Sequence, residues 1–283
     1  MLNVIFLIVI ILGLSGQNIV KKPYTKIVGE GGVYFFSTLL SAAALIFFIV
    51  ISTELKFDTS YIPYSIGFAA AYAMSSVFMV MAIANGSLSL TSLFISYSLM
   101  IPTFYGLIFL KDNISIGFIF GLFLLIISLF LVNKSDEKAK FSFKWIICVV
   151  LSFVGNGMCT VIQKMQQIAS HGAYKNEFMI AALAIVTVVM LVMSLIKEQK
   201  ELKVYAKVGW HWALICGLLN GVVNLFVMIL SGRMAVSLMF PLISAGGLAV
   251  TYIFSRFCYK EKLTKVQFVG FVFGLSAVVF LNI

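Results

Sequence analysis

Long apolar stretches and short polar stretches alternate along nearly the whole chain. Each apolar stretch holds about 20 residues, the length that an α-helix needs to cross the roughly 30 Å hydrocarbon core of a bilayer. The pattern therefore predicts an all-α integral membrane protein with ten transmembrane helices, and the short polar stretches exclude a soluble domain. The predicted spans lie near residues 2–20, 32–53, 61–83, 87–110, 114–133, 144–167, 175–196, 208–231, 234–257 and 265–283.

The second half of the chain repeats features of the first half. Segment 111–115, Lys-Asp-Asn-Ile-Ser, recurs 149 residues later as Lys-Glu-Lys-Leu-Thr at 260–264, and each copy precedes an apolar run with an asparagine at its end, Asn133 and Asn282. Matches at both ends of the repeat indicate an internal duplication with a net insertion in the loops of the second half. At the start of the halves the offset is 142 residues, and the matching residues are Gly13 with Gly155, Asn18 with Thr160, and Lys22 with Lys164.

The two halves are joined by the longest wholly polar stretch of the chain. Five predicted spans precede it and five follow it, so the second half enters the membrane from the opposite side. Inverted five-helix repeats of this kind enclose a central path in many secondary transporters. We therefore divide the chain into a first repeat at 1–133, a polar linker at 134–143 and a second repeat at 144–283.

Composition and charge agree with lipid as the main solvent. The chain is 62% hydrophobic and 11% charged, whereas charged residues make up about 25% of a soluble domain. Its net charge of +10 comes from lysines spread over the loops, which is typical of membrane topology signals rather than of nucleic-acid binding. Fifteen Lys and Arg residues follow odd-numbered spans and five follow even-numbered spans, so we predict a multi-pass protein of the cell membrane with both termini on the non-cytoplasmic side.

The predicted spans lack residues for catalysis or metal binding. All ten carboxylates lie in loops or at span ends, and both histidines lie near span ends. The four cysteines have no paired spacing and are interpreted as small buried side chains. Without a metal-binding motif, a nucleophile motif or a phosphate loop, we predict no catalytic residue, metal or cofactor. A transporter is the favoured class, and the alternatives are a non-transporting scaffold or assembly subunit and a membrane-embedded enzyme.

Polar side chains inside the apolar spans are the candidates for a substrate path. They fall on equivalent faces of the first and sixth spans and at one-turn spacing in the eighth. Such residues are costly in lipid and therefore face a cavity or a partner. Hydrogen bonds between helices, or lysines that reach the headgroups, are the alternative interpretations. We predict a path between the first, third, sixth and eighth spans, lined by Asn18, Lys22, Tyr72, Ser75, Thr160, Lys164, Asn220 and Asn224.

The charge of this predicted path limits its ligand. Two lysines without a mid-membrane carboxylate make the path neutral to positive, so neutral, zwitterionic or anionic small molecules are favoured over cations. Coupling to protons through a buried acid is not expected. The predicted partners are therefore the lipid bilayer and a small-molecule substrate, with no nucleic acid.

Prolines and glycines inside the spans predict kinks and close helix packing. Pro102 in the fourth span and Pro241 in the ninth remove backbone donors, so both helices are expected to kink, either as hinges beside the path or as ordinary membrane kinks. Glycines one turn apart let helix backbones approach closely, and we expect packing inside one bundle in preference to an obligate homodimer. Three spans carry such pairs: Gly117 with Gly121, Gly217 with Gly221, and Gly270 with Gly274.

Several of these motifs together resemble the drug/metabolite transporter superfamily, specifically its ten-helix EamA-type members. Segment 13–22, Gly-Leu-Ser-Gly-Gln-Asn-Ile-Val-Lys-Lys, is similar to the first-helix Gly-Ser-Asn…Lys pattern of that family. The junctions at 110–115 and 259–264 are similar to its Gly-Glu-Arg-Leu-Ser element, although Asp112 stands where Glu261 keeps the family residue. The family tryptophan before the first motif is also absent. With the duplication, the resemblance spans essentially all 283 residues.

The resemblance implies two inverted five-helix repeats around a central cavity that opens alternately to each side. It also implies substrates such as amino acids, sugars, nucleotide-sugars, or amphiphilic metabolites and drugs. The motifs concern helix packing and junctions, so they do not identify the substrate. The commonest orientation in the family places both termini in the cytoplasm, whereas the distribution of Lys and Arg in this chain predicts the opposite orientation.

Overall fold

The structure is a computed structural model, and it describes most of the chain. The described parts leave out several elements of the predicted repeat: all but the first residue of segment 111–115, all but the last of 260–264, linker residues 134–141, and Asn282. The account below concerns the described residues, which are 2–29, 31–86, 91, 94–95, 97–111, 116–133, 142–258 and 264–280.

Helices make up the fold, and no strand occurs among the described residues. Within them, six helices are long and apolar enough to cross a membrane, namely α1, α2, α3, α7, α8 and α9, so the chain is an all-α, multi-pass membrane protein. The helices are α1 (Leu2–Val28), α2 (Val33–Ile51), α3 (Ile62–Asn85), α5 (Met100–Phe109), α6 (Ile116–Asn133), α7 (Phe143–Ala169), α8 (Lys175–Lys197), α9 (Leu202–Ser231), α10 (Val236–Cys258) and α11 (Lys265–Phe280), with a 3₁₀ turn η1 at Tyr97–Leu99 before α5.

Two helices are longer than the apolar pattern indicated. Helix α1 continues past residue 20 and through Pro23 to Val28, and α9 begins at Leu202 rather than near 208. At 1.5 Å per residue, a 27-residue helix is about 40 Å long, which exceeds the roughly 30 Å hydrocarbon core. Hydropathy detects only the part of a helix inside lipid, so it underestimates helices whose polar ends extend beyond the core.

The predicted fourth span differs from one continuous helix. In the described part of 87–110, the 3₁₀ turn η1 leads into α5, which begins at Met100. Pro102 lies in the first turn of α5, where backbone N–H groups have no partner inside the helix, so the proline is tolerated there without a broken hydrogen bond. Pro241 lies further inside its helix, α10.

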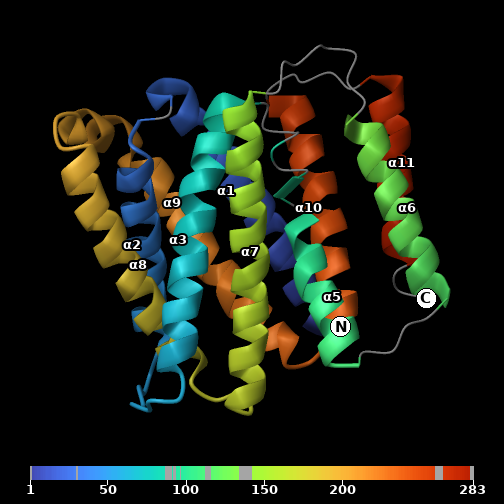
Figure 1. Cartoon of the computed structure of the whole chain (residues 1–283), viewed down its shortest axis with the longest axis horizontal. Coiled ribbons are helices and arrows are strands. Elements are labelled where there is room, and N and C mark those ends of the chain that lie inside the picture. Colours follow the sequence, from blue (N-terminus) through green and yellow to red (C-terminus); the bar gives the residue numbers. More distant parts are fainter. Residues whose placement is uncertain are drawn as a thin grey trace.

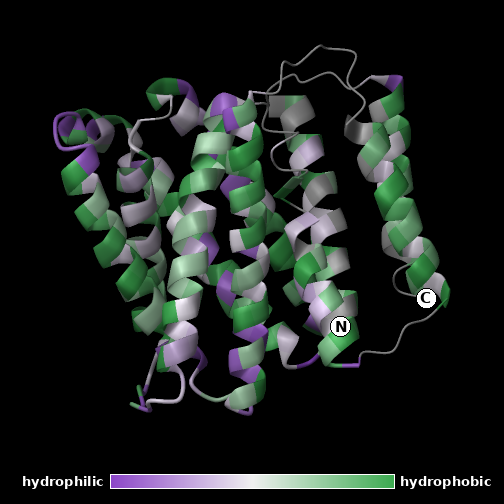
Figure 2. Ribbon diagram, viewed as in Figure 1, coloured by the Kyte–Doolittle hydropathy of each residue, from purple (hydrophilic) through white to green (hydrophobic). Residues whose placement is uncertain are grey.

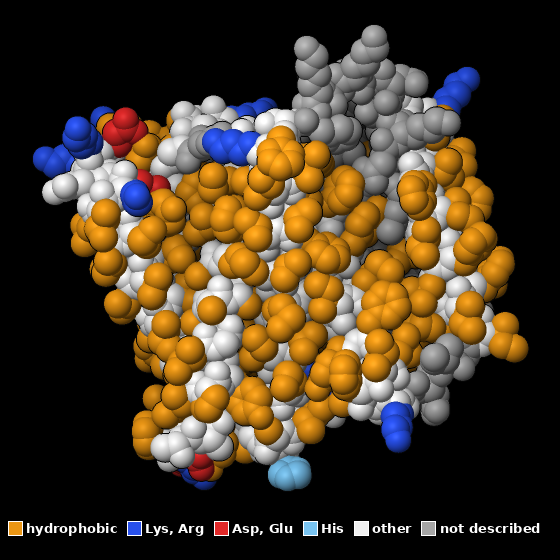
Figure 3. Space-filling view, viewed as in Figure 1, with side chains coloured by type: hydrophobic (Ala, Val, Ile, Leu, Met, Phe, Trp, Pro, Cys, Tyr) orange, Lys and Arg blue, Asp and Glu red, His pale blue; other side chains and the backbone are white. Residues whose placement is uncertain are grey.

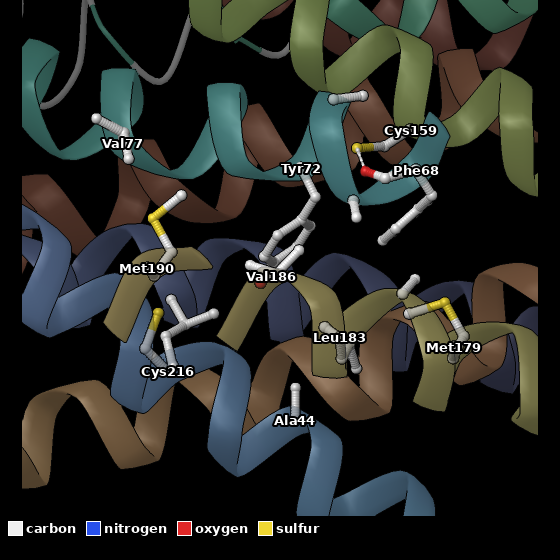
Figure 4. Packing of buried hydrophobic residues seen from close by; sticks show 14 of the residues in the cluster. Ala44, Phe68, Tyr72, Val77, Cys159, Met179, Leu183, Val186, Met190 and Cys216 are labelled. Carbon is white, nitrogen blue, oxygen red and sulfur yellow. Dashed lines mark hydrogen bonds between the residues drawn. The ribbon is translucent and has the colours of Figure 1, made fainter. Parts of the chain in front are cut away.

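The bundle is apolar on the outside and partly polar on the inside. Hydrophobic side chains cover the middle of the visible face, while charged side chains gather near its upper and lower edges (Figure 3). The ribbon coloured by hydropathy shows the same separation along the helices (Figure 2). Inside the bundle lies a cluster of buried apolar residues from α2, α3, α8 and α9 (Figure 4). Members of this cluster include Phe68, Tyr72, Leu183, Val186 and Cys216.

Long helices of the first half pack mainly against long helices of the second half. Helix α3 packs on α7, α1 on α9 and α10, and α2 on α8 and α9. Helices α6 and α11 lie side by side at one edge of the bundle (Figure 1), and α11 joins the pair to α10. The interior of the protein is therefore an interface between its two halves.

The turns that precede α2 and α8 have the same backbone conformation. Gly29 and Gly32 have φ angles of 65° and 67° before α2, and His171 and Tyr174 have φ angles of 50° and 54° before α8. Each pair is separated by the same 142 residues that relate the starts of the two halves. Left-handed backbone is unusual for residues other than glycine, so its recurrence at equivalent positions indicates a shared turn.

A buried carboxylate holds the N-terminus of α2. The Glu198 carboxylate, at the end of α8, accepts hydrogen bonds from the Tyr34 and Phe35 backbone N–H groups at 2.9 and 2.7 Å, and from the Ser194 hydroxyl at 3.0 Å. It therefore satisfies two of the N–H groups that the first turn of a helix leaves unpaired, and its charge is favourable beside the helix dipole.

We expect the Glu198→Gln substitution to lower the free energy of unfolding by about 1–3 kcal/mol, because a side-chain amide places a donor against one of these two backbone donors. The measurement is thermal unfolding of the purified protein in detergent. Glu54→Gln is the matched control, since Glu54 is exposed and loses the same charge. Equal unfolding midpoints for the two variants would contradict the role given to Glu198.

Candidate functional site

A cavity of about 130 Å³ lies inside the bundle, lined by residues of α1, α3, α7, α9 and α10. The first four of these helices correspond to the first, third, sixth and eighth predicted spans, and the sequence did not indicate the contribution of α10. Six of the eight predicted path residues line the cavity: Asn18, Tyr72, Ser75, Thr160, Asn220 and Asn224.

The other two predicted path residues, Lys22 and Lys164, are not among the described lining residues. The Lys164 ammonium donates to the Ser231 backbone carbonyl at 2.6 Å, at the C-terminal end of α9. A cation is favourable at this end of a helix because it complements the helix dipole. The lysine that does line the cavity is Lys21, whose side chain is 8% exposed.

A chain of side-chain amides crosses the cavity wall. The Gln163 amide donates to Asn224 Oδ1 at 2.7 Å, and the Asn224 amide donates to Asn220 Oδ1 at 2.9 Å. The Asn220 amide in turn donates to Gln17 Oε1 at 3.1 Å, and the Tyr72 hydroxyl donates to Asn220 Oδ1 at 3.0 Å. The chain therefore joins α7, α9, α1 and α3 around one network.

The direction of this network is set by the backbone. The Asn224 amide nitrogen also faces the Asn220 backbone carbonyl at 2.9 Å, and a carbonyl only accepts hydrogen bonds. Asn224 Nδ2 must therefore be the donor, so Asn220 Oδ1 accepts and Asn220 Nδ2 donates onward. At the end of the chain, Gln17 uses its oxygen, and its amide nitrogen has no hydrogen-bond partner among the described residues.

Gln17 and Lys21 lie one turn apart on α1 and both line the cavity. Gln17 is 4% exposed, so its unpaired amide donor is buried as well as free. Among the described lining residues none is Asp or Glu, and Lys21 is the one charged side chain. This part of the cavity therefore combines a positive charge with an unused hydrogen-bond donor.

Sequence reasoning missed Gln17, Lys21 and Gln163 because it selected a neighbouring face of α1. It grouped Asn18 with Lys22 and used the match at Lys164 to support that choice. The available signal was the one-turn spacing of Gln17 and Lys21, together with Gln163 inside an apolar span. The missed polar residues of α10, Ser244 and Thr251, also line the cavity.

The predicted glycine pairs pack inside the chain where the structure describes their surroundings. Alanine at Gly217 would overlap the Leu40 carbonyl of α2, and alanine at Gly221 would meet the ring of Phe47 at 2.6 Å. In the peripheral pair, the Ser128 hydroxyl of α6 donates to the Gly270 carbonyl of α11 at 2.5 Å, and Gly274 faces the same serine. Gly121 of α6 is buried, and Gly117 is partly buried.

The described residues include no group of three or more His, Cys, Asp or Glu side chains that could hold a metal ion. Three cysteines of this part of the chain, Cys148, Cys159 and Cys216, are buried free thiols. The chemistry available in the cavity is therefore hydrogen bonding, charge and apolar contact, which suits ligand binding.

Membrane-length helices around a buried polar cavity define a multi-pass membrane protein with an internal binding site. The profile of the EamA-like transporter family matches residues 140–283, about half of the chain. The chain belongs to this family, which is a family of membrane transporters within the drug/metabolite transporter superfamily.

Solved structures share this fold. One, titled only "Crystal structure of protein", superposes with a TM-score of 0.70 at 11% sequence identity and covers 99% of this chain and 96% of its own. At this identity the likeness concerns the fold alone. No curated protein matches the chain.

Proposed function

We propose that this protein is a secondary transporter that moves small metabolites or amphiphilic compounds across the cell membrane by alternating access through the central cavity. Its membership of the EamA-like family gives the class, and the cavity with its polar lining is the observation that carries the proposal. Neutral, zwitterionic and anionic substrates suit a cavity whose described lining has one lysine and no carboxylate.

We further propose that the cavity lies between two inverted five-helix repeats within ten membrane spans. Reciprocal packing supports the repeats. Gly13 packs on Val223 of α9, and its counterpart Gly155 packs on Ser75 of α3. Gly155 lies 142 residues after Gly13 and Val223 lies 148 after Ser75, so exchanging the halves turns one contact into the other.

Reciprocal polar contacts support the same relation. The Cys216 thiol faces the Gln17 carbonyl at 3.9 Å, and the Cys159 thiol faces the Phe68 carbonyl at 4.0 Å. The first and last of these pairs are again related by offsets of 142 and 148 residues. Two halves that contact one another in equivalent ways supply two near-equivalent arrangements, which is what alternating access requires.

For orientation we propose that both termini are non-cytoplasmic. Helix α1 begins and α11 ends toward the lower part of Figure 1, whereas the lysine-rich turn between α8 and α9 lies at the top. This separation agrees with the excess of Lys and Arg on the cytoplasmic side of membrane proteins. A reporter fused to the C-terminus tests the orientation, and activity of a reporter that works only in the cytoplasm would overturn it.

The transport proposal predicts that cysteine at Asn18 or Asn224 reacts with a water-soluble thiol reagent, in a background without native cysteines, and that a transported substrate slows the reaction. Leu12→Cys is the matched control on α1, because Leu12 is 52% exposed on the outer, apolar surface and is expected to remain unlabelled in lipid. Unlabelled cysteines at positions 18 and 224 in every condition would mean that the amides only join helices.

The decisive experiment is substrate counterflow into liposomes that contain the purified protein, after a screen of metabolites for thermal stabilisation. A ligand that binds only the folded protein raises its apparent stability, so the screen needs no prior choice of substrate. Counterflow supports a carrier. Product formation would indicate an enzyme, and a folded protein that neither transports nor turns over any stabilising ligand would indicate a scaffold.

A further inference from the structure

The position of Lys21 leaves a buried positive charge beside the cavity. Helix α1 continues seven residues beyond it to Val28, so about 10 Å of helix separates Lys21 from the end of α1. A buried charge is costly unless it is paired. Since none of the described lining residues is acidic, a negatively charged ligand is the natural partner for this ammonium.

The amide network adds hydrogen-bond donors at the same place. All its side-chain amides donate in one direction, from Gln163 through Asn224 and Asn220 to Gln17, and hydrogen bonds aligned in this way polarise one another. The free donor at its end is the Gln17 amide, one turn from Lys21. A carboxylate has only acceptors, and it forms strong charge-assisted hydrogen bonds with ammonium and amide N–H groups.

The opposite end of the cavity is apolar. Helices α1 and α9 run antiparallel, since Gly13 faces Val223 whereas Gln17 contacts Asn220. Val227 therefore lies away from Lys21. There it joins Phe240 and Ile243 of α10 in a buried apolar cluster, and all three residues line the cavity.

We infer that the cavity binds a small organic anion whose carboxylate is held by Lys21 and Gln17 and whose short apolar body lies toward Val227, Phe240 and Ile243. A volume of about 130 Å³ suits a small metabolite, because drug-sized ligands occupy about 300–1,000 Å³. The inference rests on the proposed function only in treating the cavity as the substrate site, and it narrows the substrate from three charge classes to one.

Three probes of similar size and different charge test this inference on the purified full-length protein. They are butyrate, butyramide and butylammonium, and the measurement is the shift of the unfolding midpoint with probe concentration at pH 7. We expect butyrate to stabilise the protein most, butyramide less, and butylammonium not at all. Stabilisation by butylammonium, or equal stabilisation by butyrate and butyramide, would overturn the inference even without any variant.

Variants at Lys21 locate the effect. Lys21→Met keeps the length of the side chain but removes its charge, and we expect the apparent affinity for butyrate to fall about tenfold or more, toward that of butyramide. Lys21→Arg keeps the charge and should retain most of the preference. Lys26→Met is the matched control, because Lys26 is exposed on the last turn of the same helix and lies outside the cavity lining. An unchanged preference for butyrate in Lys21→Met would place the anion site elsewhere.

Binding and counterflow separate this inference from the proposed function. If butyrate binds through Lys21 but no carboxylate exchanges across liposomes, the anion site stands and transport is contradicted. If counterflow occurs with neutral or cationic substrates while carboxylates neither bind nor compete, transport stands and the anion site is wrong. Inorganic phosphate or chloride that stabilises as well as butyrate would overturn the part of the inference that concerns an apolar body.

Discussion

The Gly155→Ala substitution is expected to lower the free energy of unfolding by about 1–3 kcal/mol and to reduce transport with it. A methyl group at this position would come within 2.7 Å of the Ala71 carbonyl oxygen and 2.8 Å of the Ser75 nitrogen. Both atoms belong to the backbone of α3, so no side chain can move aside, and α7 must shift away from α3. Because Asn156, Thr160 and Gln163 lie on α7, that shift also displaces one wall of the cavity.

The control for this prediction lies in the same interface. A methyl group at Gly67 of α3 would meet nothing closer than the end of the Ile162 side chain at 3.5 Å, which is an ordinary contact. Alanine also favours a helix over glycine by about 0.5–1 kcal/mol, so Gly67→Ala should leave stability unchanged or raise it. Thermal unfolding in detergent and counterflow in liposomes measure the two effects. A Gly155→Ala protein as stable as Gly67→Ala would refute the close approach of α7 and α3.

Hydropathy and self-similarity were sufficient to predict the class of fold. Burial in lipid demands apolar stretches of a certain length, so such stretches identify helices such as α2 and α8 directly. The ends of α1 and α9 were missed because a helix continues into the headgroup region, where polar residues carry no hydropathy signal. The 3₁₀ turn before α5 was missed because an apolar run does not distinguish a continuous helix from an interrupted one.

The candidate site was partly predictable because polar residues are expensive in a membrane. Asn220 and Asn224 stand out in an apolar span, and both line the cavity. The choice between Lys21 and Lys22 depended on the rotation of α1, which is set by packing partners such as Val223 rather than by α1 itself. Repeat symmetry also favoured the wrong lysine, because Lys22 has a lysine counterpart whereas the counterpart of Lys21 is Gln163. An asymmetric ligand site is by its nature hidden from a symmetry argument.

The Asn220→Asp substitution should reverse the charge preference of the cavity without unfolding the protein. The new carboxylate still accepts from the Tyr72 hydroxyl and the Asn224 amide, as Asn220 Oδ1 does at 3.0 and 2.9 Å. Its second oxygen replaces the donor that faced Gln17, and the free Gln17 amide nitrogen can turn to donate to it. Asn220→Leu, in contrast, leaves buried partners unsatisfied at about 1–3 kcal/mol each, so that variant should be strongly destabilised.

A carboxylate at position 220 supplies the negative charge that we assign to the ligand. It pairs with Lys21 across the cavity, so stabilisation by butyrate should fall about tenfold or more while butylammonium becomes a comparable or better ligand. Asn85→Asp is the matched control, because Asn85 lies at the end of α3 outside the cavity lining and donates to the Met81 carbonyl of its own helix. Titration of the unfolding midpoint with the two probes measures the change. Undiminished binding of butyrate by a folded Asn220→Asp protein would contradict a carboxylate site formed by Gln17 and Lys21, because two negative charges would then share a cavity whose described lining has one cation.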